Sequence, residues 1–373
     1  MQQKQPQNPM AAEPVPGLLV RIGAPIVVSM ILQAAYNVVD SAYLARMASG
    51  GETALTALSL AFPVQLVMVA VSLGTGVGTN ALLARLLGLG DKDRANAAVG
   101  NAQLLALVIS VVFMLFSAVA TVAGQLVSMA MGLAFHRKLN VELDSSLRHW
   151  KPRWDVIRSI YAIGLPAIIS QALLTVMTYS LNLILAIMPD VGQNAVTVYG
   201  LYYKIQQLII FAAFGVRDAI TPVVAFNYGL RSRARVQQGI RWGLGYTAGL
   251  MLLGCVGVEL FAQPLAGLFS LSATTHAMCV DCMRIVSLGF LFAGLCIAFQ
   301  GVFQALECGV ESLIISLCRQ VLFVLPPVWA LTRLVTGPEN VSLVWWPLAL
   351  GEAATLVVAL VLYQKRAKKR IAF

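Results

Sequence analysis

The sequence predicts an all-α membrane protein that crosses the bilayer about ten times, and three observations support this prediction. The chain is strongly apolar, with 59% hydrophobic residues, only 11% charged residues and a mean hydropathy of +0.80. Apolar runs long enough to span a bilayer recur along the whole chain. These runs lack the alternating polarity of barrel strands, so helices must satisfy the backbone in lipid.

Nine apolar runs carry this prediction, and they cover residues 18–42, 55–81, 97–136, 160–187, 195–226, 239–262, 280–304, 311–333 and 343–363. Eight of them are close in length to one span of ~20 residues. The run 97–136 is twice as long and holds no Asp, Glu, Lys, Arg or Pro. As one helix it would measure about 60 Å, twice the thickness of the hydrocarbon core. We therefore expect it to cross twice.

The basic residues explain the net charge of +10 through their positions. Most lie in alternate loops or at the chain ends, at 85–94, 137–158, 231–241 and 365–370. This is the positive-inside pattern, and it places both termini in the cytoplasm. The charge therefore requires no nucleic-acid partner.

An internal repeat appears when the second half is placed over the first with a shift of 141 residues. Matched glycines and prolines include Gly23 and Pro25 on Gly164 and Pro166, Gly74 on Gly215, and Gly88 on Gly229. Shared hydrophobicity alone would not pair glycine and proline at one offset, so duplication is the better account. It predicts a flexible tail (1–17), a first lobe (18–136), a cytoplasmic connector (137–159), a second lobe (160–363) and a basic tail (364–373).

The residues of the repeat also resemble those of multidrug and toxic compound extrusion (MATE) transporters. The resemblance rests on "GAPIVVSMILQAAYNVVDSAYLARM" and "LLGLGDKDRANAAVGNA" in the first half, and on "IYAIGLPAIIS", "AITPVVAFNYGLRSRARV" and "FQGVFQALECG" in the second. It implies a multi-pass protein of the plasma (inner) membrane that exchanges H⁺ or Na⁺ for small amphipathic or cationic compounds. No cofactor is implied besides the coupling ion.

The chain departs from the family pattern within the run 97–136. Its "LLALVISVVFMLFS" is similar to the family's third helix, and "AVATVAGQLVSMAMGLAFHRK" is similar to the sixth. The fourth and fifth helices have no counterpart, so the resemblance implies a first lobe of four spans and a second of six. Both a functional short form and an internally deleted remnant that inserts without transporting remain open.

Asp40 is the predicted coupling residue. It follows Arg21 by more than a dozen residues in an apolar run, where an unpaired carboxylate can hold a proton, a metal cation or a cationic substrate in turn. The alternative is that it lies near the outer helix end and is solvated or paired. The resemblance implies the coupling role, with Thr121 as its remaining partner. Tyr36 and Asn37 lie within one turn and are candidate substrate-cavity residues that can hydrogen-bond to Asp40.

Four further charged residues lie inside apolar runs of the second half. Arg217 and Asp218 are sequence neighbours, and i, i+1 neighbours on a helix point in different directions, so we expect each to find another partner or water. Arg319 and Glu352 are the opposite charges available for this purpose. A structural ion pair and a role in transport are equally compatible with this pattern.

Neutral polar residues within the apolar runs are the remaining candidates for a substrate cavity. They are Gln65, Asn182, Gln206 and Gln300. The same side chains are equally suited to hydrogen bonds between helices.

The sequence argues against an enzyme, because it shows no nucleophile with a base, no metal-ligand set and no phosphate loop. Cys279, Cys282 and His276 do not complete a zinc site. The leading prediction is therefore a cation-coupled exporter. A flippase for a lipid-linked precursor is the alternative within transport, and only Arg217 and Arg319 are available for its phosphate. The sequence predicts no oligomeric state.

Overall fold

The computed structural model describes residues 8–45, 51–114, 151–267, 269 and 271–372. The side chains of residues 36–66 and 113–114 are outside this description. Every regular element in the described part of the chain is a helix. The prediction of an all-α protein is therefore confirmed for these residues.

The first half contains four described helices, α1 (Pro9–Ala12), α2 (Val15–Ala45), α3 (Gly51–Leu89) and α4 (Lys92–Met114). Asn8 caps α1, because its side chain accepts a hydrogen bond from the Met10 amide at 2.9 Å. The turn after α3 contains Gly90 at φ 75°, a left-handed conformation that glycine adopts without strain. Asp91 then caps α4 by accepting from the Arg94 amide at 3.0 Å.

The second half begins with three long helices, α6 (Trp154–Ala186), α7 (Gly192–Gly229) and α8 (Arg233–Gly267). Shorter elements follow, namely α9 (Ala273–Ser287), α10 (Phe290–Ala305), α11 (Gly309–Leu317), a π-helix (Cys318–Leu322), α12 (Leu325–Thr332), a 3₁₀-helix (Pro338–Trp345), α13 (Trp346–Leu362), a second π-helix (Tyr363–Ala367) and α14 (Lys368–Arg370). Helices α9 and α10 meet at a bend of 48°.

Eight helices in the described residues are long and apolar enough to cross a membrane, or nine if α9 and α10 count as one bent span. Each predicted apolar run coincides with one of these helices, and α4 occupies the first part of the run 97–136. The predicted second crossing in that run falls on residues 115–136, which lie outside the described part.

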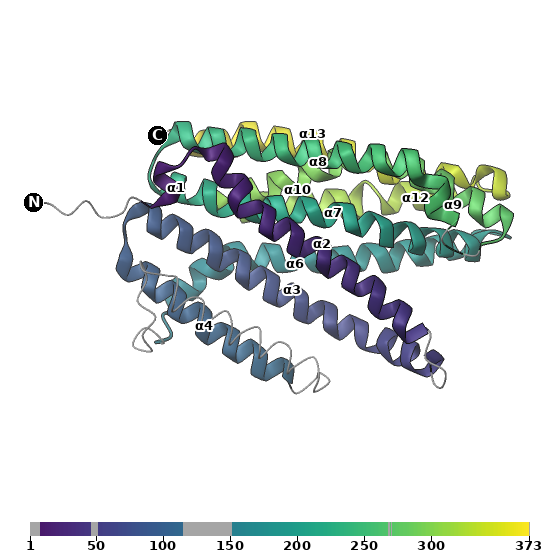
Figure 1. Cartoon of the computed structure of the whole chain (residues 1–373), viewed down its shortest axis with the longest axis horizontal. Helices are drawn as coiled ribbons and strands as arrows, with labels where there is room; N and C mark the ends of the chain where they lie inside the picture. Colours follow the sequence, from purple (N-terminus) through teal and green to yellow (C-terminus); the bar gives the residue numbers. More distant parts are fainter. Residues whose placement is uncertain (1–7, 46–50, 115–150, 268, 270, 373) are drawn as a thin grey trace, which may run out of the picture.

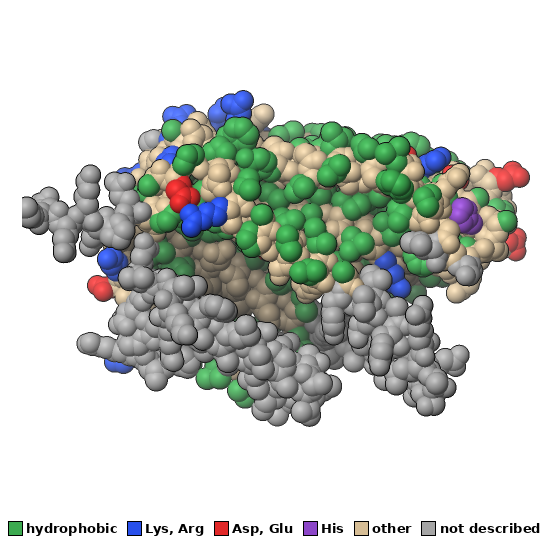
Figure 2. All heavy atoms as spheres, in the orientation of Figure 1, with side chains coloured by type: hydrophobic (Ala, Val, Ile, Leu, Met, Phe, Trp, Pro, Cys, Tyr) green, Lys and Arg blue, Asp and Glu red, His purple; other side chains and the backbone are tan. Residues whose placement is uncertain are grey.

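Helix α7 lies at the centre of the molecule and packs against α2, α3, α8 and α10, whereas α3 also packs along α6. Figure 1 shows α2 and α3 diverging from α6 and α7 toward the right end, away from the end that holds both chain termini. In Figure 2 apolar side chains cover the middle of the molecule, and most Lys and Arg side chains gather at the left end. This distribution matches a membrane protein with one basic face.

The packing of the two halves reproduces the internal repeat. A Cβ placed on Gly215 would lie 2.7 Å from the Cα of Val27, which brings α7 against α2. A Cβ on Gly74 would lie 2.8 Å from the amide nitrogen of Ile168, which brings α3 against α6. These contacts are related by the same shift of 141 residues that aligns the sequence. Equivalent glycines therefore allow equivalent helices to approach closely.

Part of the predicted flexible tail is fixed to the helices. One terminal nitrogen of Arg235 donates to the carbonyl oxygens of Met10 and Glu13, both at 2.8 Å, and its Nε donates to Asn227 at 2.8 Å. Residues 10 and 13 of the predicted tail are therefore in contact with α8 through Arg235. A guanidinium group on another helix supplies partners that the local sequence does not show.

The end of the connector is fixed as well. The Asn101 amide nitrogen donates to the Lys151 carbonyl at 3.1 Å, and its oxygen accepts from the Arg153 amide at 2.8 Å. Asn101 is completely buried in α4, so it ties the chain before α6 to the first half.

Candidate functional site

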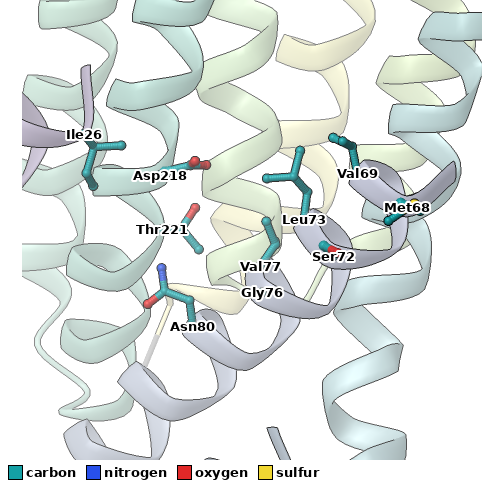
Figure 3. Close-up of a pocket in the computed structure, with 10 residues that line it drawn as sticks. All are labelled: Ile26, Met68, Val69, Ser72, Leu73, Gly76, Val77, Asn80, Asp218 and Thr221. Carbon is teal, nitrogen blue, oxygen red and sulfur yellow. The ribbon is translucent and has the colours of Figure 1, made fainter. Parts of the chain in front are cut away.

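A cavity of about 450 Å³ lies between α2, α3 and α7, where the two halves of the chain meet (Figure 3). Its described lining consists of Ile26, Met68, Val69, Ser72, Leu73, Gly76, Val77, Asn80, Asp218 and Thr221. Most of these side chains are apolar. The cavity therefore presents an apolar wall with a few polar groups, as small-molecule sites in proteins do.

The polar groups of the cavity come from both halves. Figure 3 shows Asp218 and Thr221 of α7 facing the space lined by Leu73, Val77 and Asn80 of α3. A carboxylate, a hydroxyl and an amide are thus within one compartment. Together they offer acceptors for a cationic or hydrogen-bonding ligand.

The depth of Asp218 is set by the length of α7. It precedes Gly229, the last residue of this helix, by eleven residues, or about 16 Å at 1.5 Å per residue. The carboxylate therefore lies about three turns inside the end of α7.

Arg217 and Asp218 are paired with each other. The Arg217 Nε donates to Asp218 Oδ1 at 2.8 Å, and a terminal nitrogen lies 2.7 Å from the same oxygen. The prediction that these neighbours find separate partners is wrong, because the long arginine side chain reaches back along the helix surface. No described residue donates a hydrogen bond to Asp218 Oδ2, and Asp218 lines the cavity.

Three contacts position Arg217. Its guanidinium carbon lies 4.8 Å from the centre of the Phe214 ring, a cation–π contact. A Cβ on Gly301 of α10 would lie 2.7 Å from the Arg217 Cγ, so only glycine leaves room for this side chain. Thr221 donates to the Arg217 carbonyl at 3.0 Å. Arg217 thus fills the contact between α7 and α10 while it holds Asp218.

Arg319 and Glu352 form a second, deeper ion pair. The Arg319 Nε lies 2.7 and 2.8 Å from the two carboxylate oxygens of Glu352, and both side chains are almost fully buried. Arg319 and Glu352 therefore do not serve as the partners of Asp218 and Arg217. The π-helix 318–322 and α13 bring them together instead, and neither residue lines the cavity between the halves.

The predicted neutral polar residues lie outside the described lining of the cavity. Gln300 is buried and donates to the Ser316 hydroxyl at 2.7 Å, which links α10 to α11. Asn182 of α6 has a buried oxygen without a hydrogen-bond partner in the described structure. Gln206 is partly buried in α7. The structure thus favours a helix-linking role for Gln300.

The remaining predicted residues are placed only in part. Asp40, Tyr36 and Asn37 belong to α2 and Gln65 to α3, but their side chains are outside the described structure, as is all of Thr121. Along α2, Asp40 follows Arg21 by 19 residues, or about 28 Å. Its backbone therefore lies far from the basic end of the molecule.

Sequence reasoning missed Ser72, Asn80 and Thr221 as cavity residues. Ser72 and Asn80 flank the glycine-rich stretch "LGTGVG" of α3, and small residues at helix contacts are typical of membrane proteins. That stretch was the feature of the sequence that could have pointed to Ser72 and Asn80 as cavity residues. Among the described residues, no group of three or more His, Cys, Asp or Glu could hold a metal ion.

The sequence and the fold both have relatives among known proteins. The model of the family described as MatE matches residues 25–130 and 166–329. The multidrug export protein MepA of Staphylococcus saprophyticus is 24% identical over 233 residues, which cover 61% of this chain and 48% of that protein. The FAD transporter of Shewanella oneidensis is 21% identical over 401 positions, which cover 85% of this chain and 88% of that protein.

Two solved structures show the same fold. One is described as the outward-facing conformation of a multidrug resistance MATE family transporter, with a TM-score of 0.86, 19% identity and 99% coverage of both chains. The other is a MOP superfamily transporter from Pyrococcus furiosus, with a TM-score of 0.86, 18% identity and full coverage of both chains. The matched part of this chain spans about half the length of the MepA relatives.

Proposed function

Since this chain belongs to the MatE family of membrane transporters, we propose that it exports small amphipathic or cationic compounds in exchange for H⁺ or Na⁺. Family membership identifies a multi-pass transporter rather than an enzyme. The names of the MepA relatives support multidrug export as the activity.

The cavity between the two halves is the observation that carries this proposal. Its volume of about 450 Å³ falls within the range of small-molecule sites, roughly 300–1,000 Å³. Apolar residues of α3 suit the hydrophobic part of an amphipathic compound. The Asp218 oxygen that Arg217 does not contact can accept a hydrogen bond from the polar part of such a compound.

The arrangement of the helices supports alternating access. At the basic end, Gly88 of α3 and Gly229 of α7 allow the halves to touch, whereas α2 and α3 diverge from α6 and α7 toward the other end (Figure 1). With the basic end in the cytoplasm, the described state is closed on the cytoplasmic side. Separation of Gly88 from Gly229 would then open the cavity inward.

Asp40 is the proposed coupling residue, supported by Thr121, Tyr36 and Asn37. One reason is that two of the carboxylates inside the apolar runs already have cations among the described residues, Asp218 through Arg217 and Glu352 through Arg319. A carboxylate inside an apolar run can exchange a proton or Na⁺ against a cationic substrate. Gln65 and Gln206 remain proposed cavity residues.

The proposed topology has four spans in the first lobe, six in the second and both termini in the cytoplasm of the plasma membrane. The clustering of basic residues beside the chain ends supports this orientation (Figure 2). The alignment with the FAD transporter extends over 401 positions but covers only 85% of this chain of 373 residues. Such an alignment requires gaps in this chain, as a first lobe shorter than that of its relatives would also produce.

A flippase for lipid-linked phosphates receives less support. Its cleft would need free cations, and the two intramembrane arginines that the sequence offered are each neutralised by a carboxylate. Neither arginine has net charge to offer to a phosphate.

The test is energy-dependent efflux of the cationic dye ethidium from cells that express the full chain. We expect Asp218→Asn to lower efflux about tenfold, because a neutral amide loses a charge-assisted contact worth about 1.5–3 kcal/mol. Asp190→Asn changes an exposed carboxylate at φ 60° and serves as the matched control. Asp40→Asn should abolish the response to an uncoupler or to removal of Na⁺.

Two outcomes would contradict the proposal. Absence of efflux by a chain that inserts normally would identify a remnant without transport activity. Equal efflux by the Asp218 variant and the Asp190 control would show that the cavity is not the substrate site.

A further inference from the structure

We propose that the basic segment 365–370 and the start of α11 form a binding site for the phosphate headgroup of an anionic phospholipid. A second cavity, of about 570 Å³, lies there and is lined by Glu311, Lys365, Arg366, Lys369 and Arg370. It shares no lining residue with the cavity between the halves. This inference is independent of the proposed function.

The charge of this second cavity favours an anion as its ligand. Four cations and one carboxylate line it, which leaves a net charge of +3. The four basic residues are exposed, and none of them forms an ion pair with a described residue. Like charges crowded at one site repel each other. A phosphate group between them would remove this repulsion and accept several hydrogen bonds.

The helix geometry holds these cations on one side. Lys365, Arg366, Lys369 and Arg370 are spaced so that they cover one face, while Ala367 and Ile371 are buried on the other. The two buried residues fix the rotation of the segment.

Arg370 anchors the segment to the turn between α10 and α11. It donates to the Leu306 carbonyl at 2.8 Å and lies 3.4 Å from the Glu307 carbonyl. This contact brings the basic segment beside Glu311, in the first turn of α11. The walls of the cavity are therefore held together rather than formed by free side chains.

The level of the cavity in the bilayer favours a lipid over a soluble anion. Val361 of α13 is 43% exposed, and Lys365 follows it by four residues, or about 6 Å along a helix. On the other wall Val310, 63% exposed, directly precedes Glu311. The cavity thus begins where the apolar, lipid-facing surface ends. Basic pockets at this level between spans suit the headgroups of anionic lipids.

Native mass spectrometry of the purified full chain tests the proposal. The protein is titrated with phosphatidylglycerol and, separately, with zwitterionic phosphatidylcholine of the same acyl chains. Combining Lys365→Gln, Arg366→Gln and Lys369→Gln should weaken phosphatidylglycerol binding about tenfold or more, because each cation contributes about 1 kcal/mol near such a lipid. Arg370 is kept because it has a structural role.

The matched control combines Lys92→Gln, Arg94→Gln and Arg233→Gln, which removes the same charge from exposed positions outside the cavity. It should bind phosphatidylglycerol as the unchanged protein does. Equal loss in the two variants would overturn the proposal in favour of a diffuse basic face. Equal binding of the two lipids would also overturn it. Inorganic phosphate that binds as tightly as phosphatidylglycerol would assign the cavity to a soluble anion instead.

Discussion

Gly88 of α3 and Gly229 of α7 lie against each other although 141 residues separate them, because a Cβ on Gly229 would lie 3.1 Å from the Cα of Gly88. They are equivalent positions of the internal repeat. Gly229 is the last residue of α7 and Gly88 is the last but one of α3, and a basic turn follows each, so the repeat places the same residue at both sides of one contact. This contact joins the two halves at the basic end of the molecule.

Gly229→Ala should therefore destabilise the protein by about 1–3 kcal/mol, because the added methyl group forces α3 and α7 apart. Heating the purified protein and measuring its remaining monodisperse fraction would show the loss. Gly257→Ala in α8 is the control, since a Cβ there meets nothing within 4 Å. It should be neutral or gain up to about 1 kcal/mol from helix propensity. Equal stability of the two variants would contradict the close contact.

Gly301→Ala should lower dye efflux, because a Cβ 2.7 Å from the Arg217 Cγ displaces the arginine that holds Asp218. The expected cost in stability is about 1–3 kcal/mol, which leaves a folded protein to be assayed. Gly249→Ala, in open space on α8, is the matched control for the same efflux measurement. Unchanged efflux in both variants would show that the position of Arg217 has no influence on transport.

Glu352→Gln should destabilise the protein by about 3–5 kcal/mol, because it leaves Arg319 buried without its counter-charge. Replacing both residues by methionine should cost much less, since an apolar pair avoids the desolvation of two ions. Thermal unfolding of the purified variants distinguishes the two cases. If the double variant lost as much stability as the two single variants lost together, this account would be contradicted. Glu339→Gln, at an exposed site, controls for the loss of one carboxylate.

Asn101→Ala should release the end of the connector. The substitution removes the hydrogen bonds to the Lys151 carbonyl and the Arg153 amide, each worth about 1 kcal/mol. Trypsin cleavage after Arg153 should then become about tenfold faster, as judged from the fragments over time. Asn340→Ala, in an exposed segment, should leave the cleavage rate unchanged. A cleavage rate in Asn101→Ala equal to that of the unchanged protein would mean that other contacts hold the connector.

Arg235→Lys should free the N-terminal segment, because an ammonium group cannot reproduce the forked contacts to Met10, Glu13 and Asn227. Hydrogen exchange of the amides of residues 10–13 should become faster. Arg233→Lys, at an exposed neighbouring site, keeps the charge and should leave exchange as it is. Equal exchange in both variants would show that α1 is held by its own cap at Asn8.

The sequence by itself determined the class of fold and the order of its helices. Both depend on local composition, since a run of apolar residues must form a helix in lipid wherever the rest of the chain lies. The repeat also needed only the sequence, because glycines and prolines at one offset mark equivalent helix contacts. Gly74 and Gly215 illustrate this, as both allow the close approach of a helix from the other half.

Only the tertiary structure decided which charges pair and which residues share a cavity. Arg217 turns back to Asp218, and Arg319 meets Glu352 across two helices, whereas helix spacing alone predicted other partners. The cavity combines Asp218 with Asn80, residues of helices that come together only through packing. The physical reason is that side-chain reach and helix crossing set these contacts, and neither is encoded in the pattern of any single helix.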